Sequence, residues 1–526
     1  MSTSPDVAAI AKGYTFDTPA IELGVLVDGN PVPDAKVRIS LSMLNRHGLV
    51  AGATGTGKTK TLQLMAEQIA RAGVPVFAAD IKGDLSGLAL AGKSSDKLLA
   101  RTAAIGQDWQ PHGCPVEFYA LGGQGTGVPL RATISSFGPI LLSKVLGLNE
   151  TQESTLGLVF HFCDTQGLPL LDLEDLRSVL AYLTSEEGKA DLKNLGGVSS
   201  ATAGVILRSL VTLQTQGGEE FFGEPEFDSR DLLRTTPDGQ GVISLLELPN
   251  LNDRPAIFST FLMWLLADLF HDLPEVGDVD KPKLVFFFDE AHLLFADASK
   301  AFLQAIAQTV RLIRSKGVGI FFVTQTPKDV PEDVLAQLGS RVQHQLRAHT
   351  PNDAKALKAT VATYPNSGYD LAEVLQSLGI GEAIVTVLNP NGAPTPVAWT
   401  RMRAPEASMD PMDAQMMAGG VAQSGMMGKY GQAVNRDSAY EMLTRKLQQG
   451  SAAAAAEAQR AEQEKAAAAE AKQREKDAAA QSRGTSSRQV PKSAVEKVLS
   501  SPTFWNKVIT VGGQIARGMM GTGRKR

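Results

Sequence analysis

Cysteine is scarce in this sequence, and long apolar runs and an excess of positive charge are absent. Two cysteines in 526 residues, Cys114 and Cys163, supply neither a disulfide framework nor the spacing of a zinc site, which indicates a reducing cytoplasm. The N-terminus has no apolar signal segment, and the most apolar stretch, 257–270, is too short to span a bilayer and contains Asp268. A formal net charge of -5 excludes a uniformly basic nucleic-acid binder, although a local basic channel stays possible.

The apolar residues that are present, 43% of the chain, are enough to form a full core. They recur as short strand-like runs that alternate with helical stretches. This alternation predicts an α/β fold with a mostly parallel, three-layer sheet. The expected strands are 47–51, 74–80, 241–248, 283–290, 317–325, 341–348 and 381–388.

Changes in composition divide the chain into segments. The first is a small β element, and the sheet core comes in two halves with a mostly helical insertion between them. Beyond the core we expect a Met-, Gly- and Ala-rich flexible connector, an Ala-rich charged helix and a basic amphipathic tail. In that order the segments are 1–45, 46–140, 141–235, 236–405, 406–450, 451–482 and 483–526.

The stretch GATGTGKT, residues 52–59, follows an apolar strand and opens a helical pattern. Glycines let successive backbone N–H groups turn inward, and a helix N-terminus adds partial positive charge, so this order predicts a phosphate-binding P-loop. Lys58 is expected to reach the β- and γ-phosphates of ATP, and the Thr59 hydroxyl to bind Mg²⁺. The predicted nucleotide-binding residues are Gly52, Ala53, Thr54, Gly55, Thr56, Gly57, Lys58, Thr59 and Lys60.

A second motif, KPKLVFFFDEAHLLF at 281–295, places an apolar run directly before two acids. This is the Walker B pattern of a hydrolytic ATPase. Asp289, at the end of the strand, is predicted to hold Mg²⁺ beside Thr59, and Glu290 to orient and deprotonate the attacking water. The glutamate distinguishes the motif from that of small GTPases, and the sequence contains no N-K-x-D guanine-reading motif.

Two further polar residues end predicted strands. Gln325 follows the apolar run GVGIFFVT, and in a sheet that joins this strand to the P-loop strand it can sense the γ-phosphate. Asp80 ends the strand after the P-loop helix and is predicted to assist the metal or the water.

Together, GATGTGKT, FAADIKGDLSGL, FFFDEAHLLF and VRLIRSKGVGIFFVTQTPKDVPEDVLAQLGSRVQHQLRA resemble the HerA–FtsK superfamily of P-loop ATPases, and most closely its YjgR-type branch. The resemblance covers roughly residues 20–400. It implies a RecA-like core and an ATP-driven motor, typically a hexameric ring that moves DNA. The resemblance also implies that an arginine from the neighbouring subunit completes each active site. Arg314 is the first choice for that arginine and Arg311 and Arg341 are others, while Arg46 is a further choice and a predicted nucleotide contact.

Two other functions fit the sequence. One is an ATP-driven protein remodeller or regulator, whose partner docks on the Ala-rich helix or the tail. The other is a nucleotide-gated scaffold at the inner face of a membrane, with Phe504 and Trp505 in a basic tail that binds an anionic surface. The Ala-rich helix itself is either a solvated single helix or a helix for a specific partner.

Overall fold

The computed structural model describes residues 6–191, 196–248, 255–295 and 300–481. The chain divides after Lys446 into two units. Among the described residues, no helix is long and apolar enough to cross a membrane. The predicted basic tail, 483–526, lies outside the described residues.

A single 12-stranded sheet runs through the first unit, in the order β2-β1-β12-β11-β10-β3-β9-β8-β4-β7-β5-β6. Every neighbouring pair from β10 to β6 is parallel, whereas β11, β12, β1 and β2 add antiparallel strands at one side. The mostly parallel sheet predicted from the sequence is therefore confirmed. The strands are β1 (Ala20–Asp28), β2 (Asn30–Ser40), β3 (Gly48–Ala51), β4 (Val76–Asp80), β5 (Val116–Leu121), β6 (Val128–Leu130), β7 (Ile243–Glu247), β8 (Leu284–Phe288), β9 (Val318–Thr324), β10 (Ser340–Gln343), β11 (Glu382–Thr386) and β12 (Ala398–Met402).

The central strands are buried on both faces, which is why they read as continuous apolar runs. Successive side chains of β8 point to opposite faces, so Phe287 joins the core on one side of the sheet and Phe286 and Phe288 the core on the other. Helix α2 (Lys58–Arg71) covers the first side, and α10 (Pro255–Asp272) with α12 (Lys300–Ile313) covers the second. This is the three-layer arrangement expected.

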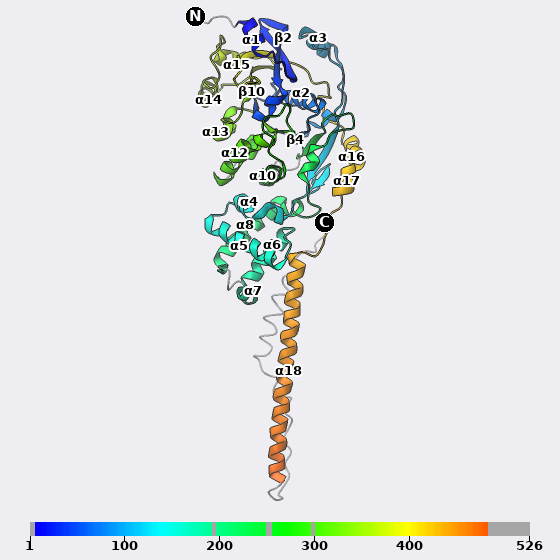
Figure 1. Ribbon diagram of the computed structural model, residues 1–526, viewed down its shortest axis with the longest axis vertical. Coiled ribbons are helices and arrows are strands. Elements are labelled where there is room, and N and C mark those ends of the chain that lie inside the picture. Colours follow the sequence, from blue (N-terminus) through cyan, green and yellow to red (C-terminus); the bar gives the residue numbers. More distant parts are fainter. Residues whose placement is uncertain (1–5, 192–195, 249–254, 296–299, 482–526) are drawn as a thin grey trace. The chain divides into compact units, whose positions relative to one another are not determined.

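Helices fill the chain between β6 and β7 and form a group of their own in Figure 1. Their apolar residues, such as Leu156, Leu176 and Leu210, are fully buried and share one core with α10. The helices of this insertion are α4 (Ile134–Val145), α5 (Glu150–Gln166), α6 (Leu173–Leu183), α7 (Glu186–Asp191), α8 (Ser200–Leu213) and α9 (Glu219–Phe221). The shorter helices elsewhere are α1 (Val7–Gly13), α3 (Asp96–Ala104), α11 (His292–Phe295), α13 (Glu332–Leu335), α14 (Pro351–Val361) and α15 (Leu371–Ser377).

The segment after β12 differs from the flexible connector expected for 406–450. It contains α16 (Ala414–Ala422), α17 (Gly425–Tyr430) and the first turns of α18 (Ala439–Gln481). Tyr430 and Leu443 are buried in the same core as the helical insertion. The composition predicts a linker because Met, Gly and Ala also occur in linkers, but Met417 is buried here and Met426 and Met427 pack partly against the core, while most of the glycines are exposed.

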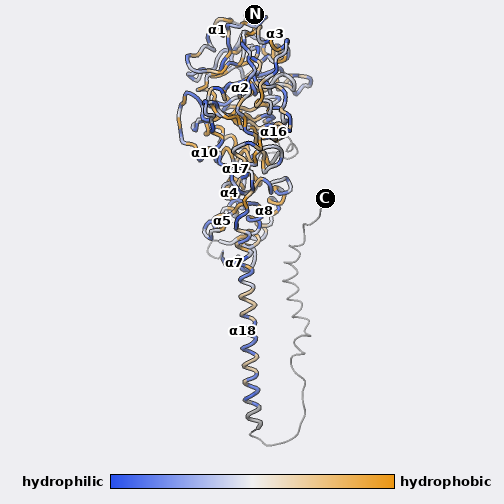
Figure 2. Tube along the Cα trace, turned by 90° about the vertical axis from the view of Figure 1, so that its right-hand side faces the viewer, coloured by the Kyte–Doolittle hydropathy of each residue, from blue (hydrophilic) through white to orange (hydrophobic). Residues whose placement is uncertain are grey.

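The second unit contains the rest of α18, which includes the predicted Ala-rich helix. Its side chains are exposed from Leu447 to Arg474, and the hydropathy colouring shows mostly polar and weakly apolar residues along it (Figure 2). With only Ala as an apolar residue over most of its length, the helix has no stripe that could join a core.

Candidate active site

The P-loop connects β3 to α2. Gly55 and Gly57 have φ values of 82° and 119°, which other residues adopt at a cost, and α2 begins at Lys58 directly after them. The Thr56 hydroxyl donates to the Ala53 carbonyl at 2.7 Å and closes the loop. The loop therefore presents the N-terminus of a 14-residue helix, the geometry expected of a phosphate-binding loop, and phosphate binding by GATGTGKT stays a prediction.

Lys58 lies folded into this loop and is 6% exposed. Its Nζ donates to the Ala53 carbonyl at 3.3 Å. Burial lowers the pKa of Lys58, while the carboxylates of Glu290 and Asp289 oppose the shift. Thr59 follows in the first turn of α2, as predicted. The Lys60 side chain is engaged elsewhere, because its Nζ donates to the Met409 carbonyl.

A buried histidine holds the loop from the β10 side, and the sequence analysis did not identify it. His344 Nε2 lies 2.9 Å from Thr61 Oγ1, and its Nδ1 lies 2.8 Å from the Glu382 carbonyl. Burial lowers the pKa of His344 to about 4. The neutral ring then donates from Nδ1 to the carbonyl and accepts the Thr61 hydroxyl at Nε2. The histidine thus ties α2 to β11.

Asp289 lies at the carboxyl end of β8, with β9 between it and the P-loop strand. It is 1% exposed, and burial together with the adjacent Glu290 carboxylate raises its pKa to about 7. Oδ1 accepts the Glu290 backbone N–H at 2.9 Å, whereas Oδ2 is buried without a hydrogen-bond partner among the described residues. A buried carboxylate oxygen without a partner fits a role in the coordination shell of a divalent cation.

Glu290 is buried and has a φ of 46°, an uncommon value for a residue other than glycine. Its Oε1 forms an ion pair with Lys82 Nζ, and its Oε2 lies 3.2 Å from His292 Nδ1 without hydrogen-bond geometry. The predicted base therefore lies beside Asp289, and a lysine that was not predicted occupies one of its oxygens.

Asp80 has both oxygens engaged by the turn that follows β4. Oδ1 accepts from Gly83 N at 2.7 Å and from Asp84 N at 3.2 Å, and Oδ2 accepts from Leu85 N at 2.7 Å. Burial raises the pKa of Asp80 to about 6. This geometry fixes the turn that carries Lys82, and the metal-binding role of Asp80 stays a prediction.

Glu247, at the end of β7, pairs in register with Asp80 and was also missed by the sequence analysis. Burial, together with the charge of Asp80, raises the pKa of Glu247 to about 8. The described residues contain no group of three or more His, Cys, Asp or Glu side chains that could hold a metal by themselves. A Mg²⁺ ion here would therefore need phosphate oxygens and waters beside Thr59 and Asp289, as is usual for this ion.

The sequence model of the helicase HerA-like C-terminal family matches residues 27–526. The chain belongs to this family.

Two curated relatives match different lengths of this HerA-like chain. A probable helicase of Methanocaldococcus jannaschii is 34% identical over 153 residues, which is 27% of this chain and 28% of that protein. The DNA double-strand break repair helicase HerA of Sulfolobus acidocaldarius is 22% identical over 379 residues, which is 70% of this chain and 67% of that protein. The chain thus spans about a quarter of the first relative and two thirds of the second.

Solved structures of the bacterial conjugative coupling protein TrwB have the same fold. The unbound form of TrwBdeltaN70 gives a TM-score of 0.51 at 14% identity, over 78% of this chain and 93% of the TrwBdeltaN70 chain. TrwB in complex with the ATP analogue ADPNP also gives 0.51, at 15% identity, over 77% of this chain and 94% of TrwB. At this identity the likeness establishes a RecA-like P-loop fold for the HerA-like chain.

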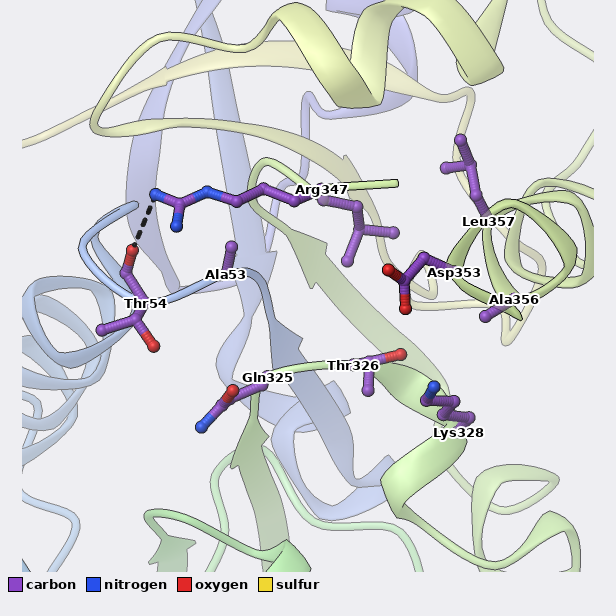
Figure 3. A pocket seen from close by; sticks show the side chains of 10 residues that line it. Ala53, Thr54, Gln325, Thr326, Lys328, Arg347, Asp353, Ala356 and Leu357 are labelled. Atoms are coloured by element: carbon purple, nitrogen blue, oxygen red, sulfur yellow. Dashed lines mark hydrogen bonds between the residues drawn. The ribbon is translucent and has the colours of Figure 1, made fainter. Parts of the chain in front are cut away.

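Gln325 follows β9 and lines a pocket of about 240 Å³ beside the P-loop. Figure 3 shows Arg347 extending across this pocket to the Thr54 carbonyl, to which its Nη2 donates at 3.4 Å, with Lys328 at another side. The P-loop, the predicted sensor and two cations therefore share one pocket. Arg347 was not predicted, although it stands in the run VQHQLRA on which the HerA resemblance rests.

Three of the four predicted arginines lie together near the amino ends of the parallel strands, whereas the P-loop lies at the carboxyl ends. Arg46 precedes β3 and Arg314 precedes β9, so both lie at the amino ends of strands whose carboxyl ends carry the P-loop and Gln325. Arg311 and Arg314 line a pocket of about 310 Å³ with Asp278, and Arg46 Nη2 lies 3.4 Å from Asp278 Oδ1.

These positions separate Arg46 and Arg314 from the P-loop of their own chain. The nucleotide contact predicted for Arg46 therefore requires a neighbouring chain. Arg341 lies apart from the cluster, in β10, where it donates to Thr363 Oγ1 and lies 5.8 Å from the centre of the Tyr364 ring.

Proposed function

We propose that this HerA-like chain is a Mg²⁺-dependent ATPase that works as an oligomeric ring and acts on DNA, with a hexamer as the favoured ring size. The observation that carries the proposal is the row of polar groups at the carboxyl ends of adjacent strands. It comprises Lys58 after β3, Gln325 after β9 and Asp289 with Glu290 after β8. In-line phosphoryl transfer to water needs a cation at the phosphates, a metal ligand and a base, and this edge supplies all three.

The roles follow from the positions. Lys58 and the N–H groups at the start of α2 bind the β- and γ-phosphates, and the Thr59 hydroxyl and Asp289 would hold Mg²⁺. The ion supplies charge that offsets the phosphates and polarises the γ-phosphoryl group. Glu290 orients the attacking water and accepts its proton, and Gln325 contacts the γ-phosphate.

The ring is supported by the arginine cluster. Arg46, Arg311 and Arg314 lie near the amino ends of the strands, and the P-loop lies at the carboxyl ends. They can therefore contact a nucleotide only if it is bound to another copy of the chain. Such an arginine stabilises charge that develops on the transferred phosphoryl group and contributes roughly 10³–10⁵ in rate. Action on DNA is supported by the HerA relative, a DNA double-strand break repair helicase, and by the cations Lys328 and Arg347 at the pocket beside the P-loop.

One assay tests the proposal. ATP turnover is measured with and without Mg²⁺ and with and without double-stranded DNA at two salt concentrations, and molecular mass is measured with and without ATP. We expect turnover that requires Mg²⁺, stimulation by DNA that weakens as salt rises, and a mass increase with ATP. Absence of Mg²⁺-dependent turnover in all conditions would contradict the ATPase itself.

Of the two alternatives from the sequence, the membrane-tethered scaffold depends on the tail at 483–526, outside the described residues, and the protein remodeller on that tail or the Ala-rich helix. Stimulation by a protein partner and not by DNA would favour the remodeller. Binding of the full chain to anionic vesicles without DNA stimulation would favour the scaffold.

A further inference from the structure

A short turn before β11 presents an apolar side chain to solvent next to the P-loop. Ile380 is 75% exposed, more than any other large apolar side chain in the described part of the chain. An exposed isoleucine alone is ordinary on a protein surface. The surroundings of Ile380 are unusual, because its turn is fixed to the loop that is predicted to hold the phosphates.

Backbone contacts join the turn and the P-loop. The Gly381 N–H donates to the Thr56 carbonyl at 3.0 Å. A side-chain carbon built on Gly57 would lie 3.5 Å from Gly381 Cα, so the two backbones are near van der Waals contact. Ile380 therefore directly precedes Gly381, whose backbone lies against Gly57 at the start of α2.

Arg101 of α3 holds the turn from its other side. Its Nη2 donates to the Gly381 carbonyl at 2.9 Å and to the Met402 carbonyl at 3.1 Å. Gly381 has a φ of 72°, and a side-chain carbon there would come within 2.5 Å of Arg101 Nη2. The turn thus has a fixed conformation before any ligand binds, and this conformation requires glycine at 381.

The order of strands determines which end of a nucleotide lies at this turn. The γ-phosphate belongs near Asp289 and Glu290 on β8, which is two strands from β3 on one side. Gly381 immediately precedes β11, which is two strands from β3 on the opposite side. A triphosphate bound across the N-terminus of α2 with its γ end toward β8 therefore directs its nucleoside end toward Ile380.

We propose that the turn 378–381 is the nucleoside-binding surface of this site and that the Ile380 side chain packs against the base. The proposal rests on the nucleotide site of the proposed function and adds the residue that contacts the part of ATP beyond its phosphates. An apolar contact of this kind favours a nucleotide over bare triphosphate. It recognises the face of a base, so it accepts adenine and guanine alike.

The test compares two ligands that differ only by the nucleoside, ATP and inorganic tripolyphosphate. Their affinities for the full chain are measured by titration calorimetry in excess Mg²⁺, at a temperature where turnover is negligible. Ile380→Ala is expected to weaken ATP binding about tenfold and to leave tripolyphosphate binding within about twofold. Since the side chain is exposed, the substitution removes little that stabilises the fold. The matched control is Ile140→Ala, at a 63% exposed isoleucine on α4, which should change neither affinity.

The outcomes separate this inference from the proposed function. Wild-type affinity of Ile380→Ala for ATP would overturn the inference and leave the ATPase intact. Equal weakening of ATP and tripolyphosphate would also overturn it, because the turn would then shape the P-loop and not contact the base. Failure of the wild-type chain to bind either ligand would contradict the proposed function itself.

Discussion

The Lys82 ammonium and the Glu290 carboxylate form an ion pair across the carboxyl ends of the neighbouring strands β4 and β8. A carboxylate oxygen that is held by a cation is less accessible to an incoming water than an unpaired one. The turn that carries Lys82 is fixed by the bonds from Asp80 to three backbone N–H groups. While this ion pair persists, Oε1 of Glu290 is occupied, and only Oε2, which has no hydrogen-bond partner among the described residues, is open to the attacking water.

Replacing Lys82 by methionine tests this relationship. With the cation removed and the base kept, we expect basal ATP turnover to rise about two- to fivefold. The comparison variant is Glu290→Gln, which should bind ATP normally and turn it over at least about a hundredfold more slowly, because only the base is lost. Lys82→Met turnover as low as that of Glu290→Gln would mean that Lys82 is needed in the reaction. Wild-type turnover in Glu290→Gln would show that another group is the base.

Lys58→Ala is expected to abolish ATP binding in a fluorescent-nucleotide titration. The ammonium is the cation folded into the loop, and the described residues offer no other cation in its position. Lys60→Ala serves as the control, since its Nζ is bonded to the Met409 carbonyl, and its affinity should stay within about threefold of wild type. Equal losses in both variants would indicate that the helix start, and not Lys58, had been damaged.

Arg314→Ala should keep ATP binding and lose turnover, because the residue lies at the edge of the sheet away from its own P-loop. Mixing it with Lys58→Ala creates interfaces in which an intact P-loop faces an intact arginine, so part of the turnover should return. The measurement is the ATPase rate across mixing ratios. A flat line at the level of the two inactive variants would exclude Arg314 as the shared residue and shift the test to Arg311 or Arg46.

His344 should make the stability of the fold depend on pH. Its pKa is lowered to about 4 in the folded protein, so between that value and the usual 6.5 the unfolded chain binds more protons. The stabilisation is complete above about pH 6.5 and declines as pH falls toward 4. In urea unfolding, the stability gap between wild type and His344→Asn should shrink by about 2 kcal/mol from pH 7.5 to pH 5.0. The matched control is His161→Asn, at an exposed histidine on α5, which should leave the urea midpoint at pH 7.5 close to that of wild type.

A chain that ends after Gly450 should fold and keep its basal turnover. The start of α18 belongs to the first unit through buried Leu443 and through Lys446, whose Nζ lies 3.0 Å from Asp191 Oδ2, and both residues precede this end. A chain that ends after Asp437 removes them and should unfold at lower urea. We also expect the Gly450 truncation to weaken association with DNA or lipid, measured by co-sedimentation. Loss of basal turnover in the Gly450 truncation would show that the core needs residues beyond 450.

The sequence predicts best where local pattern and burial agree. The strands β8 and β9 are apolar throughout because both faces are covered, and the loop between β3 and α2 has a motif that only one geometry satisfies. Lys82, Glu247 and His344 could not be placed in the same way, since their roles depend on which strands are neighbours. The strand expected at 341–348 ends at Gln343, although the His344 N–H still donates to the Ala51 carbonyl at 2.7 Å, because the neighbouring strand β3 ends at Ala51, where the P-loop begins.

The antiparallel side of the sheet has a consequence for synthesis of the chain. Strand β1 pairs with β12, in a register that places Gly24 opposite Met402. Ribosomes add about 5–20 residues per second, so one edge of the β1–β2 hairpin waits about 20–80 s for its partner. An unpaired strand edge is a template for other chains. Slow translation of the stretch between these strands, or a high density of ribosomes on one message, should therefore raise the aggregation of nascent chains more than that of the finished protein.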